Sequence, residues 1–304
     1  MKKVLIAAPI SKTFKEWLIK KNYELIFYPS DKIENNLLEG IVTSNKLLLD
    51  EKELQTYNAL KWIARLGSGM EIIDTTYCER HDIKYFSSPN GISNAVAEHT
   101  IGMLLSLLHR IQISSMQIRN GNWIREENRG FELDGKVVGI IGYGHTGIAF
   151  AKKLSVFTKN ILVFDKYKTN FKEDFFEECS LECIQENADI ISFHVPLNQE
   201  TTNYYSYDFF SKMKKNHILI NTSRGPVTPS EVLLHGLKNG KIEGACLDVL
   251  EEEKNINHFL KDKNSSIYQL LNHNTILTPH IAGYTFDAIE KMSNELMTQL
   301  DEVI

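Results

Sequence analysis

The feature that most constrains the fold is a glycine-rich turn between an apolar run and a helical segment. Val137–Ile141 leads directly into the turn at residues 142–147, and helix-length sequence follows. In this G-x-G-x-x-G pattern, Gly142 permits a tight turn, Gly144 lets the backbone approach a pyrophosphate, and Gly147 allows close helix–strand packing. The pattern therefore predicts a dinucleotide site at a helix N-terminus in a parallel sheet.

An acidic residue closes the next predicted strand. Asp165 follows Ile161–Phe164, about 20 residues beyond the glycine turn, where the dinucleotide fingerprint requires an acid. A carboxylate there accepts hydrogen bonds from the ribose 2′-hydroxyl and repels a 2′-phosphate, which favours NAD over NADP. Lys166 and Lys168 follow closely and could soften this discrimination, so its strictness stays open.

The rest of the chain alternates short apolar runs with helix-length segments. Such alternation predicts parallel sheets with crossover helices, because parallel neighbours need a connection long enough to recross the sheet. The predicted strands are Val4–Ala8, Leu25–Tyr28, Gly40–Thr43, Lys61–Ala64 and Lys84–Ser87 in a first series, then Val137–Ile141, Ile161–Phe164, Ile190–Phe193, Ile218–Asn221, Gly244–Asp248 and Thr275–Leu277 in a second. We expect two α/β domains, the second of them doubly wound.

Two helices set the expected domain boundaries. An apolar stretch from Ser93 to Leu108 predicts a buried helix, and Asp287–Ile304 predicts an amphipathic helix that remains after the second series is complete. We therefore expect one domain to be discontinuous, with residues 1–92 and 283–304, and the other to comprise residues 93–282.

Composition and charge exclude several classes of protein. The chain has 304 residues, 42% hydrophobic and 24% charged, and a formal net charge of −5. This charge is too small to predict nucleic acid or an anionic membrane surface as a partner. The apolar run Val4–Ile10 is too short for a signal peptide, and no run approaches the roughly 18 apolar residues of a membrane span. We expect a cytoplasmic protein.

The cysteines and histidines do not predict a metal or redox site. The 4 cysteines, Cys78, Cys179, Cys183 and Cys246, are scattered, and no pair has Cys-x-x-Cys spacing. The histidines lack paired ligand spacing, so no metal is expected.

Seven distinctive sequence motifs follow one another along nearly the whole chain. They are Ala64–Asp74, Ala95–His99, the glycine turn, His194–Leu197, Ile220–Gly225, Leu247–Glu251 and Thr278–Gly283. Their order and spacing resemble the D-isomer-specific 2-hydroxyacid dehydrogenase family, closest to its D-3-phosphoglycerate dehydrogenase-like branch. The resemblance implies a Rossmann NAD-binding domain inserted into a flavodoxin-like substrate domain. Because the chain ends soon after the last helix, we expect the short form without a C-terminal regulatory domain.

The resemblance places the catalytic residues at Arg224, Glu253 and His280. Reduction of a 2-oxo acid needs a cation that holds the carboxylate and polarises the ketone, and a planar guanidinium does both. It also needs a proton donor that titrates near neutrality, which is typical of histidine. Glu253 is expected to orient the imidazole. It is the last residue of the acidic run 251–253, and the other two glutamates, Glu251 and Glu252, are decoys, because such a run is usually a solvated face. Lys254 stands where the family usually has proline.

The resemblance also implies the remaining site residues. The cofactor-binding set is Gly142, Gly144, His145, Thr146, Gly147, Asp165, His194, Val195, Pro196, Thr222, Ser223, Asp248 and Gly283, with Asp248 near the nicotinamide carboxamide. The substrate-binding set is Lys46, Ser68, Gly69 and Arg224. From the residues alone, His194 is equally well explained as a packed histidine at a strand end.

Substrate identity stays open at this point. In phosphoglycerate-directed members two arginines hold the phosphate, and here these positions are Ser44 and Lys46. The first candidate is 3-phosphohydroxypyruvate, in serine biosynthesis. The alternatives are hydroxypyruvate, glyoxylate and pyruvate, the last corresponding to a D-lactate type reductase. A non-catalytic NAD-sensing scaffold is the alternative from another class. The resemblance implies that the apolar helix Ala95–Leu108, with the segment through Trp123, forms a two-fold homodimer interface.

Overall fold

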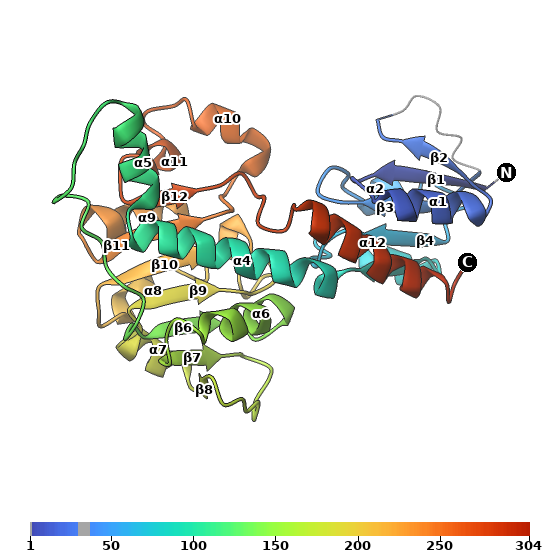
Figure 1. The fold of residues 1–304 in the computed structure, drawn as a ribbon. Coiled ribbons are helices and arrows are strands. Elements are labelled where there is room, and N and C mark those ends of the chain that lie inside the picture. Colours follow the sequence, from blue (N-terminus) through green and yellow to red (C-terminus); the bar gives the residue numbers. More distant parts are fainter. Residues whose placement is uncertain (1, 30–36) are drawn as a thin grey trace. The chain divides into compact units, whose positions relative to one another are not determined.

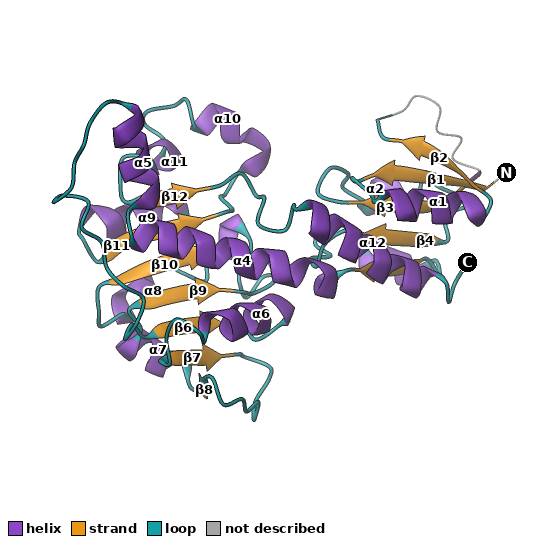
Figure 2. Cartoon of the chain, in the orientation of Figure 1, coloured by secondary structure: helices purple, strands orange, loops and turns teal. Residues whose placement is uncertain are grey.

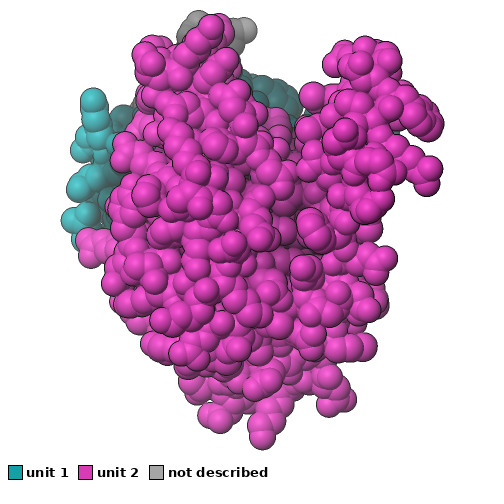
Figure 3. Space-filling view, turned by 90° about the vertical axis from the view of Figure 1, so that its left-hand side faces the viewer, with its two compact units in different colours: residues 1–95, 283–304 teal, residues 96–282 magenta. Residues whose placement is uncertain are grey.

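Two separate parallel sheets organise the chain, as seen in this computed structural model, which describes residues 2–29 and 37–304. Unit 1 comprises residues 1–95 and 283–304, and unit 2 comprises residues 96–282 (Figure 3). The predicted division is at residues 92 and 282. The chain leaves unit 1 within a helix that begins at Pro89. The sequence predicted a start at Ser93, four positions later. The helix begins earlier because proline suits the first turn of a helix.

Unit 1 is built on a sheet whose order is β2-β1-β3-β4-β5, with every pairing parallel in the described residues (Figure 1). This is the flavodoxin-like order that the resemblance implies. The strands are β1 (Lys2–Ala7), β2 (Tyr23–Phe27), β3 (Leu38–Thr43), β4 (Trp62–Arg65) and β5 (Lys84–Ser87). The helices are α1 (Lys12–Lys20), α2 (Glu51–Leu54), α3 (Thr75–Arg80), the start of α4 (Pro89–Leu108) and α12 (Phe286–Leu300).

The C-terminal helix belongs to the core of unit 1. Thr285 caps the start of α12, and its apolar face is buried with Phe14 and Leu18 of α1. Leu296 and Leu300 are both 0% exposed, and complete burial of a leucine side chain contributes roughly 1.5–3 kcal/mol. The segment after Gly283 therefore stabilises the domain that the first residues of the chain begin.

Unit 2 contains a parallel sheet of order β12-β11-β10-β9-β6-β7-β8 (Figure 2). The strands are β6 (Val138–Ile141), β7 (Ile161–Phe164), β8 (Glu177–Glu178), β9 (Ile190–Phe193), β10 (His217–Asn221), β11 (Ile242–Leu247) and β12 (Thr275–Leu277). The helices are α5 (Ile111–Arg119), α6 (His145–Leu154), α7 (Leu181–Asn187), α8 (Tyr207–Lys212), α9 (Ser230–Lys238), α10 (Ile256–Phe259) and α11 (Ser266–Leu270), with the 3-10 turns η2 (Gly225–Val227) and η3 (Glu253–Asn255).

The doubly wound fold predicted for this domain is confirmed, with one strand more than the sequence indicated. β8 consists of two glutamates, so no apolar run marks it. The other strands are almost continuously buried because helices cover both faces of the sheet. Leu104 of α4 and Phe150 of α6 pack on one face with Ile140, whereas Phe193 and Leu219 belong to the core of the other face.

Candidate active site

In the glycine turn after β6, two of the three glycines are packed against backbone and the third faces open space. Gly142 has φ +99°, and a Cβ there would lie 2.3 Å from the carbonyl oxygen of His194. A Cβ on Gly147 would lie 2.1 Å from the carbonyl oxygen of Gly142. A Cβ on Gly144, in contrast, would meet nothing within 4 Å. The turn is thus held tightly against its own strand while its middle glycine faces open space.

The N-terminus of α6 fits an anionic ligand. Gly144 is the N-cap residue and makes no side-chain capping bond, and the first turn contains no acidic residue. The first backbone N–H groups of a helix have no partner within it, and the helix dipole favours negative charge there. The space in front of Gly144 and these donors fit the pyrophosphate of a dinucleotide.

Asp165, directly after β7, joins two turns. Its carboxylate accepts hydrogen bonds from the backbone N–H groups of Tyr143 at 2.7 Å, Tyr167 at 2.9 Å and Lys168 at 3.0 Å. Burial alone would raise the pKa of Asp165, but these bonds and the ammonium of Lys168 hold the pKa below its ordinary value. A carboxylate has about four lone-pair positions, so Asp165 retains acceptor capacity for a ribose hydroxyl.

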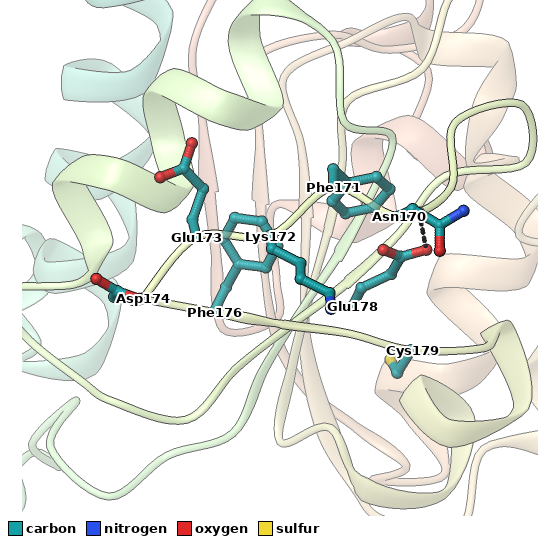
Figure 4. A pocket seen from close by; sticks show the side chains of 8 residues that line it. All are labelled: Asn170, Phe171, Lys172, Glu173, Asp174, Phe176, Glu178 and Cys179. Carbon is teal, nitrogen blue, oxygen red and sulfur yellow. Dashed lines mark hydrogen bonds between the residues drawn. The ribbon is translucent and has the colours of Figure 1, made fainter.

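Aromatic side chains support the glycine turn from the segment that joins β7 to β8. The ring of Tyr143 stacks on Phe171 with a centroid distance of 4.4 Å and lies 5.0 Å from the ring of Phe176. Both phenylalanines line an open pocket of about 650 Å³ (Figure 4). The lining residues of this pocket, Asn170, Phe171, Lys172, Glu173, Asp174, Phe176, Glu178 and Cys179, include none of the candidate catalytic residues.

His194 is packed inside the domain. Its Nε2 lies 2.8 Å from Oγ of Ser192, and its ring lies 5.1 Å from the ring of Phe150. Burial lowers the pKa of His194 to about 3, so the ring is neutral. The structure therefore favours the packed interpretation of this side chain, and its backbone carbonyl is the part that faces Gly142.

The other predicted cofactor residues differ in exposure. His145 and Pro196 are exposed, and Thr146, Val195 and Gly283 are half-buried. Thr222 is buried, with its hydroxyl 3.1 Å from that of Thr100, and the hydroxyl of Ser223 donates to Oδ1 of Asn221 at 2.7 Å. Residues 222 and 223 are therefore held rigidly at the end of β10.

The three candidate catalytic residues follow three neighbouring strands. Arg224 comes after β10, Glu253 after β11 and His280 after β12. The carboxyl ends of parallel strands meet at one edge of a sheet, which is where ligands bind in open α/β folds. Oε2 of Glu253 lies 2.8 Å from Nδ1 of His280. Arg224 is half-buried, and its Nη1 donates to the carbonyl oxygen of Ser223 at 2.7 Å.

The acidic run after β11 sends its side chains to different partners. Oε2 of Glu251 accepts a hydrogen bond of 2.6 Å from the backbone N–H of Ser230, the first residue of α9. Glu252 has φ +57°, a left-handed conformation, and is the N-cap residue of η3, which begins at Glu253. Glu253 alone of the three is bonded to His280 among the described contacts. The geometry thus separates Glu253 from the two decoys.

Asp248 holds the turn that carries His280. Its carboxylate accepts hydrogen bonds from the hydroxyl of Thr278 at 2.6 Å and from the backbone N–H groups of Ile281 at 2.9 Å and Ala282 at 2.8 Å. Its carbonyl oxygen accepts from the N–H of His280 at 2.8 Å. Because His280 has φ +54°, an unfavourable region for a non-glycine residue, these bonds fix a strained turn. The resemblance predicted a role toward nicotinamide and did not reveal this one.

His99 completes the same network from α4. Its Nε2 lies 3.0 Å from the hydroxyl oxygen of Thr278 and 3.6 Å from Oδ1 of Asp248. Since the Thr278 proton points to Asp248, the Nε2–H of His99 is the donor to Thr278. His99 lies in one of the distinctive motifs, but no signal in the sequence linked it to a residue so distant along the chain.

Of the predicted substrate residues, Arg224 lies in unit 2, and the other three, Lys46, Ser68 and Gly69, lie in unit 1. Lys46 and Ser68 are exposed, and Gly69 is half-buried. Their loops are shaped by Arg65, which the sequence did not single out. Its guanidinium donates to the carbonyl oxygens of Gly69 at 3.0 Å and Leu66 at 3.3 Å, and to Oδ1 of Asn45 at 2.6 Å.

A doubly wound domain with this glycine turn, an anionic residue after β7 and a histidine–carboxylate pair defines a dinucleotide-dependent oxidoreductase. Residues 101–282 match the family model of the D-isomer specific 2-hydroxyacid dehydrogenase, NAD binding domain. The chain belongs to this family. It is an NAD-dependent enzyme, and this finding sets aside the alternative of a non-catalytic NAD sensor.

Known proteins similar to the chain differ in substrate. A glyoxylate reductase of Thermofilum pendens is 36% identical over 81% of this chain and 74% of its own. A D-3-phosphoglycerate dehydrogenase of Archaeoglobus fulgidus is 29% identical over 94% of this chain and 54% of its own. The crystal structure of D-lactate dehydrogenase from Aquifex aeolicus, in complex with NAD and lactic acid, has a TM-score of 0.85 with 28% identity, covering 99% of this chain and 94% of that one.

The described residues contain neither a membrane-spanning helix nor a cluster of metal ligands. No helix among them is long and apolar enough to cross a bilayer. Within the same residues, no group of three or more histidine, cysteine, aspartate or glutamate side chains is arranged to hold a metal ion.

Proposed function

We propose that Arg224, Glu253 and His280 interconvert a small D-2-hydroxy acid and its 2-oxo acid. The observation that carries this proposal is the 2.8 Å contact between Oε2 of Glu253 and Nδ1 of His280. An ionised carboxylate only accepts hydrogen bonds, so Nδ1 carries the proton of the pair. Nε2 of His280 is then left to exchange a proton with the substrate oxygen.

Each residue has one task in this reaction. Arg224 binds the substrate carboxylate and polarises the adjacent C=O group through its paired N–H donors. His280 donates a proton to the oxygen on carbon 2 during reduction and accepts it during oxidation. Glu253 orients the ring and stabilises the imidazolium form. The nicotinamide, when bound, supplies or accepts the hydride at carbon 2.

The same chain places the cofactor through separate groups. We propose that Gly144 and the first turn of α6 bind the pyrophosphate and that Asp165 binds the adenosine ribose. The open space at Gly144 and the pKa of Asp165, held below its ordinary value, support these roles. We also propose that the backbone at His194 to Pro196, residues 222 and 223, Asp248 and Gly283 line the cofactor site.

For the substrate, we propose a small 2-oxo acid without a phosphate group, with glyoxylate, hydroxypyruvate and pyruvate as candidates. Ser68 and Gly69 of unit 1 are the proposed carboxylate-binding backbone. In the segment that would hold a phosphate, the hydroxyl of Ser44 donates a hydrogen bond to the carbonyl oxygen of Ala7 at 3.4 Å. The side-chain oxygen of Asn45 accepts a hydrogen bond from Arg65. A bidentate arginine fork for phosphate is absent from residues 44–46, which the structure describes.

A second candidate substrate is 3-phosphohydroxypyruvate, which the exposed Lys46 favours. Initial rates of NADH oxidation with all four 2-oxo acids test both candidates. We expect the highest kcat/KM with an unphosphorylated acid and little effect of Lys46→Ala on it. A preference for 3-phosphohydroxypyruvate that Lys46→Ala abolishes would establish the second candidate, and inactivity toward the whole panel would refute the proposed function.

We further propose that the chain forms a homodimer through α5 and the segment that follows it. α4 is largely buried by its own chain, whereas the following segment exposes large apolar side chains, with exposed fractions of 54% for Ile111, 54% for Met116, 83% for Trp123 and 69% for Phe131. Exposed apolar patches of this kind are typical of protein interfaces. We expect a dimer in sedimentation velocity at micromolar concentration and a monomer for Met116→Glu combined with Trp123→Glu. A monomeric unmodified chain would refute the interface.

We also propose a cytoplasmic location, because all four cysteines are free thiols in the described residues and such thiols are typical of a reducing compartment. Localisation of a fluorescently tagged chain tests this. Recovery outside the cytoplasm would contradict it.

A further inference from the structure

Two lysines lie beside the residue that is proposed to bind the adenosine ribose. Lys166 and Lys168 follow Asp165 within three positions. Cationic side chains near the 2′-position are what accommodates the extra phosphate of NADP. From their sequence positions, the two lysines would favour NADP if their ammonium groups were free to bind its 2′-phosphate.

Lys168 is engaged at the glycine turn. Its Nζ donates to the carbonyl oxygen of Tyr143 at 2.8 Å, while its backbone N–H donates to Asp165 at 3.0 Å. The side chain thus folds back across the turn after β6 and reinforces the same contact between turns that Asp165 makes.

Lys166 is engaged by a carboxylate from another loop. Its Nζ lies 2.8 Å from Oε1 of Glu200, which belongs to the loop after β9. The hydroxyl of Tyr167 donates to Oε2 of the same carboxylate. The ammonium also lies 5.5 Å from the centroid of the Tyr167 ring. Hydrogen bonds from Lys166 and Tyr167 hold the pKa of Glu200 below its ordinary value, so this carboxylate is ionised.

We propose that Glu200 is a specificity-determining residue that favours NAD over NADP by holding Lys166. This inference rests on the proposed position of Asp165 at the ribose. A 2′-phosphate at that position has to compete with Glu200 for the ammonium, whose charge the ion pair already neutralises, and it faces the negative charge of Asp165. The neutral 2′-hydroxyl of NAD meets neither penalty.

The test measures the dissociation constants of NAD⁺ and NADP⁺ by isothermal titration calorimetry on the full chain at low salt. Glu200→Gln removes the charge and keeps the shape. We expect the ratio of the NADP⁺ to the NAD⁺ dissociation constant to fall about three- to fivefold, as befits an exposed ion pair. The effect should shrink in 0.5 M salt because exposed charges are screened.

Lys166→Met supplies the complementary variant. Combined with Glu200→Gln, it should restore the ratio of the unmodified chain. Alone, it should leave the ratio nearly unchanged, because the ammonium is already held. An unchanged ratio in Glu200→Gln, a gain that persists in the double variant, or a several-fold loss of NADP⁺ affinity in Lys166→Met alone would each overturn the proposal.

A matched control separates this effect from a general change of charge. Asp208 forms a comparable exposed ion pair, 2.6 Å from Nζ of Lys212 in α8, and Asp208→Asn should not alter the ratio. Asp165→Asn tests the underlying assignment separately. If it leaves NAD⁺ affinity unchanged, the proposed ribose position fails, whatever the result for Glu200.

Discussion

Glu253 and His280 come from the loops after two neighbouring strands, and their side chains meet at 2.8 Å between Oε2 and Nδ1. The histidine backbone is held by Asp248 through the N–H of residue 280, so ring and main chain are fixed by different partners. This arrangement sets the tautomer of the imidazole. In the proposed mechanism, Nε2 is the atom that exchanges the proton.

Replacement of Glu253 tests this relationship. Glu253→Gln keeps a hydrogen-bond acceptor but removes the charge that stabilises the imidazolium. We expect kcat for 2-oxo acid reduction to fall by about 10- to 100-fold with the KM for NADH nearly unchanged. Steady-state kinetics with the best substrate of the panel measures both quantities.

The neighbouring glutamates provide matched controls. Glu252→Gln should leave kcat within about twofold, because no described contact links Glu252 to the site. Glu251→Gln keeps an acceptor for the backbone N–H of Ser230 but loses the negative charge at the start of α9, so it should lower the melting temperature slightly, at a cost of about 0.3–1 kcal/mol. If Glu252→Gln reduced kcat as strongly as Glu253→Gln, the assignment within the acidic run would be wrong.

Arg224→Lys separates charge from geometry. An ammonium keeps the positive charge but loses the planar pair of donors that binds a carboxylate and an adjacent carbonyl together. We expect KM for the 2-oxo acid to rise and kcat to fall, for a total loss in kcat/KM of about 100-fold or more, or roughly 3 kcal/mol. A change confined to the NADH affinity would contradict the proposed role.

Asp248→Asn tests the support of the strained turn. The carboxylate accepts one hydroxyl and two backbone N–H bonds, and the amide group of asparagine has to oppose at least one of these donors. We expect a stability loss of about 1–3 kcal/mol, together with reduced kcat because the turn carries His280. Thermal unfolding and kinetics on one preparation check both effects, and a variant with unaltered melting temperature would argue against the network.

Two buried histidines make stability depend on pH. Burial lowers the pKa of His217 to about 4 and that of His194 to about 3, whereas histidine in an unfolded chain titrates near 6.5. The unfolded state therefore binds more protons below about pH 6.5, and folding stability falls as pH decreases from there toward 4. Each histidine costs roughly 2 kcal/mol at pH 5.

His217→Gln isolates one of these contributions. The ring of His217 is bonded to the hydroxyl of Tyr205 at 2.7 Å, and glutamine preserves a polar partner without titrating. We expect a smaller drop in melting temperature between pH 7 and pH 5 than in the unmodified chain. Equal drops in the two proteins would show that His217 does not titrate as its burial implies.

The sequence predicted those parts of the site whose chemistry is local. The glycine turn, Asp165 and the strand that precedes each catalytic residue could be recognised because a strand, a turn and a helix follow one another within about 20 residues. The roles of Arg224 and His280 came from the resemblance to the family. They remain proposals that the geometry supports.

Contacts between distant residues could not be predicted in this way. Three such contacts join segments that the sheet brings together. They are the hydrogen bond of Glu251 to α9, the hydrogen bond between His99 and Thr278, and the salt bridge between Glu200 and Lys166. The sequence does not predict β8, because this strand consists of two glutamates and has no apolar residue, although it is paired with β7. The sequence does not predict the position of Arg65, because its hydrogen bonds to Gly69 and Asn45 form only when the loops come together.

The most direct test of the central claim is the turnover of His280→Ala compared with its affinity for NADH. We predict a loss of kcat of about 10²- to 10⁴-fold with the NADH dissociation constant within about twofold, because Gly144 and Asp165 bind the cofactor independently. In the unmodified enzyme, reduction uses the protonated imidazole and oxidation the neutral one, so the two directions should respond to pH in opposite senses. Near-normal turnover of His280→Ala with an unchanged pH profile would show that another group transfers the proton.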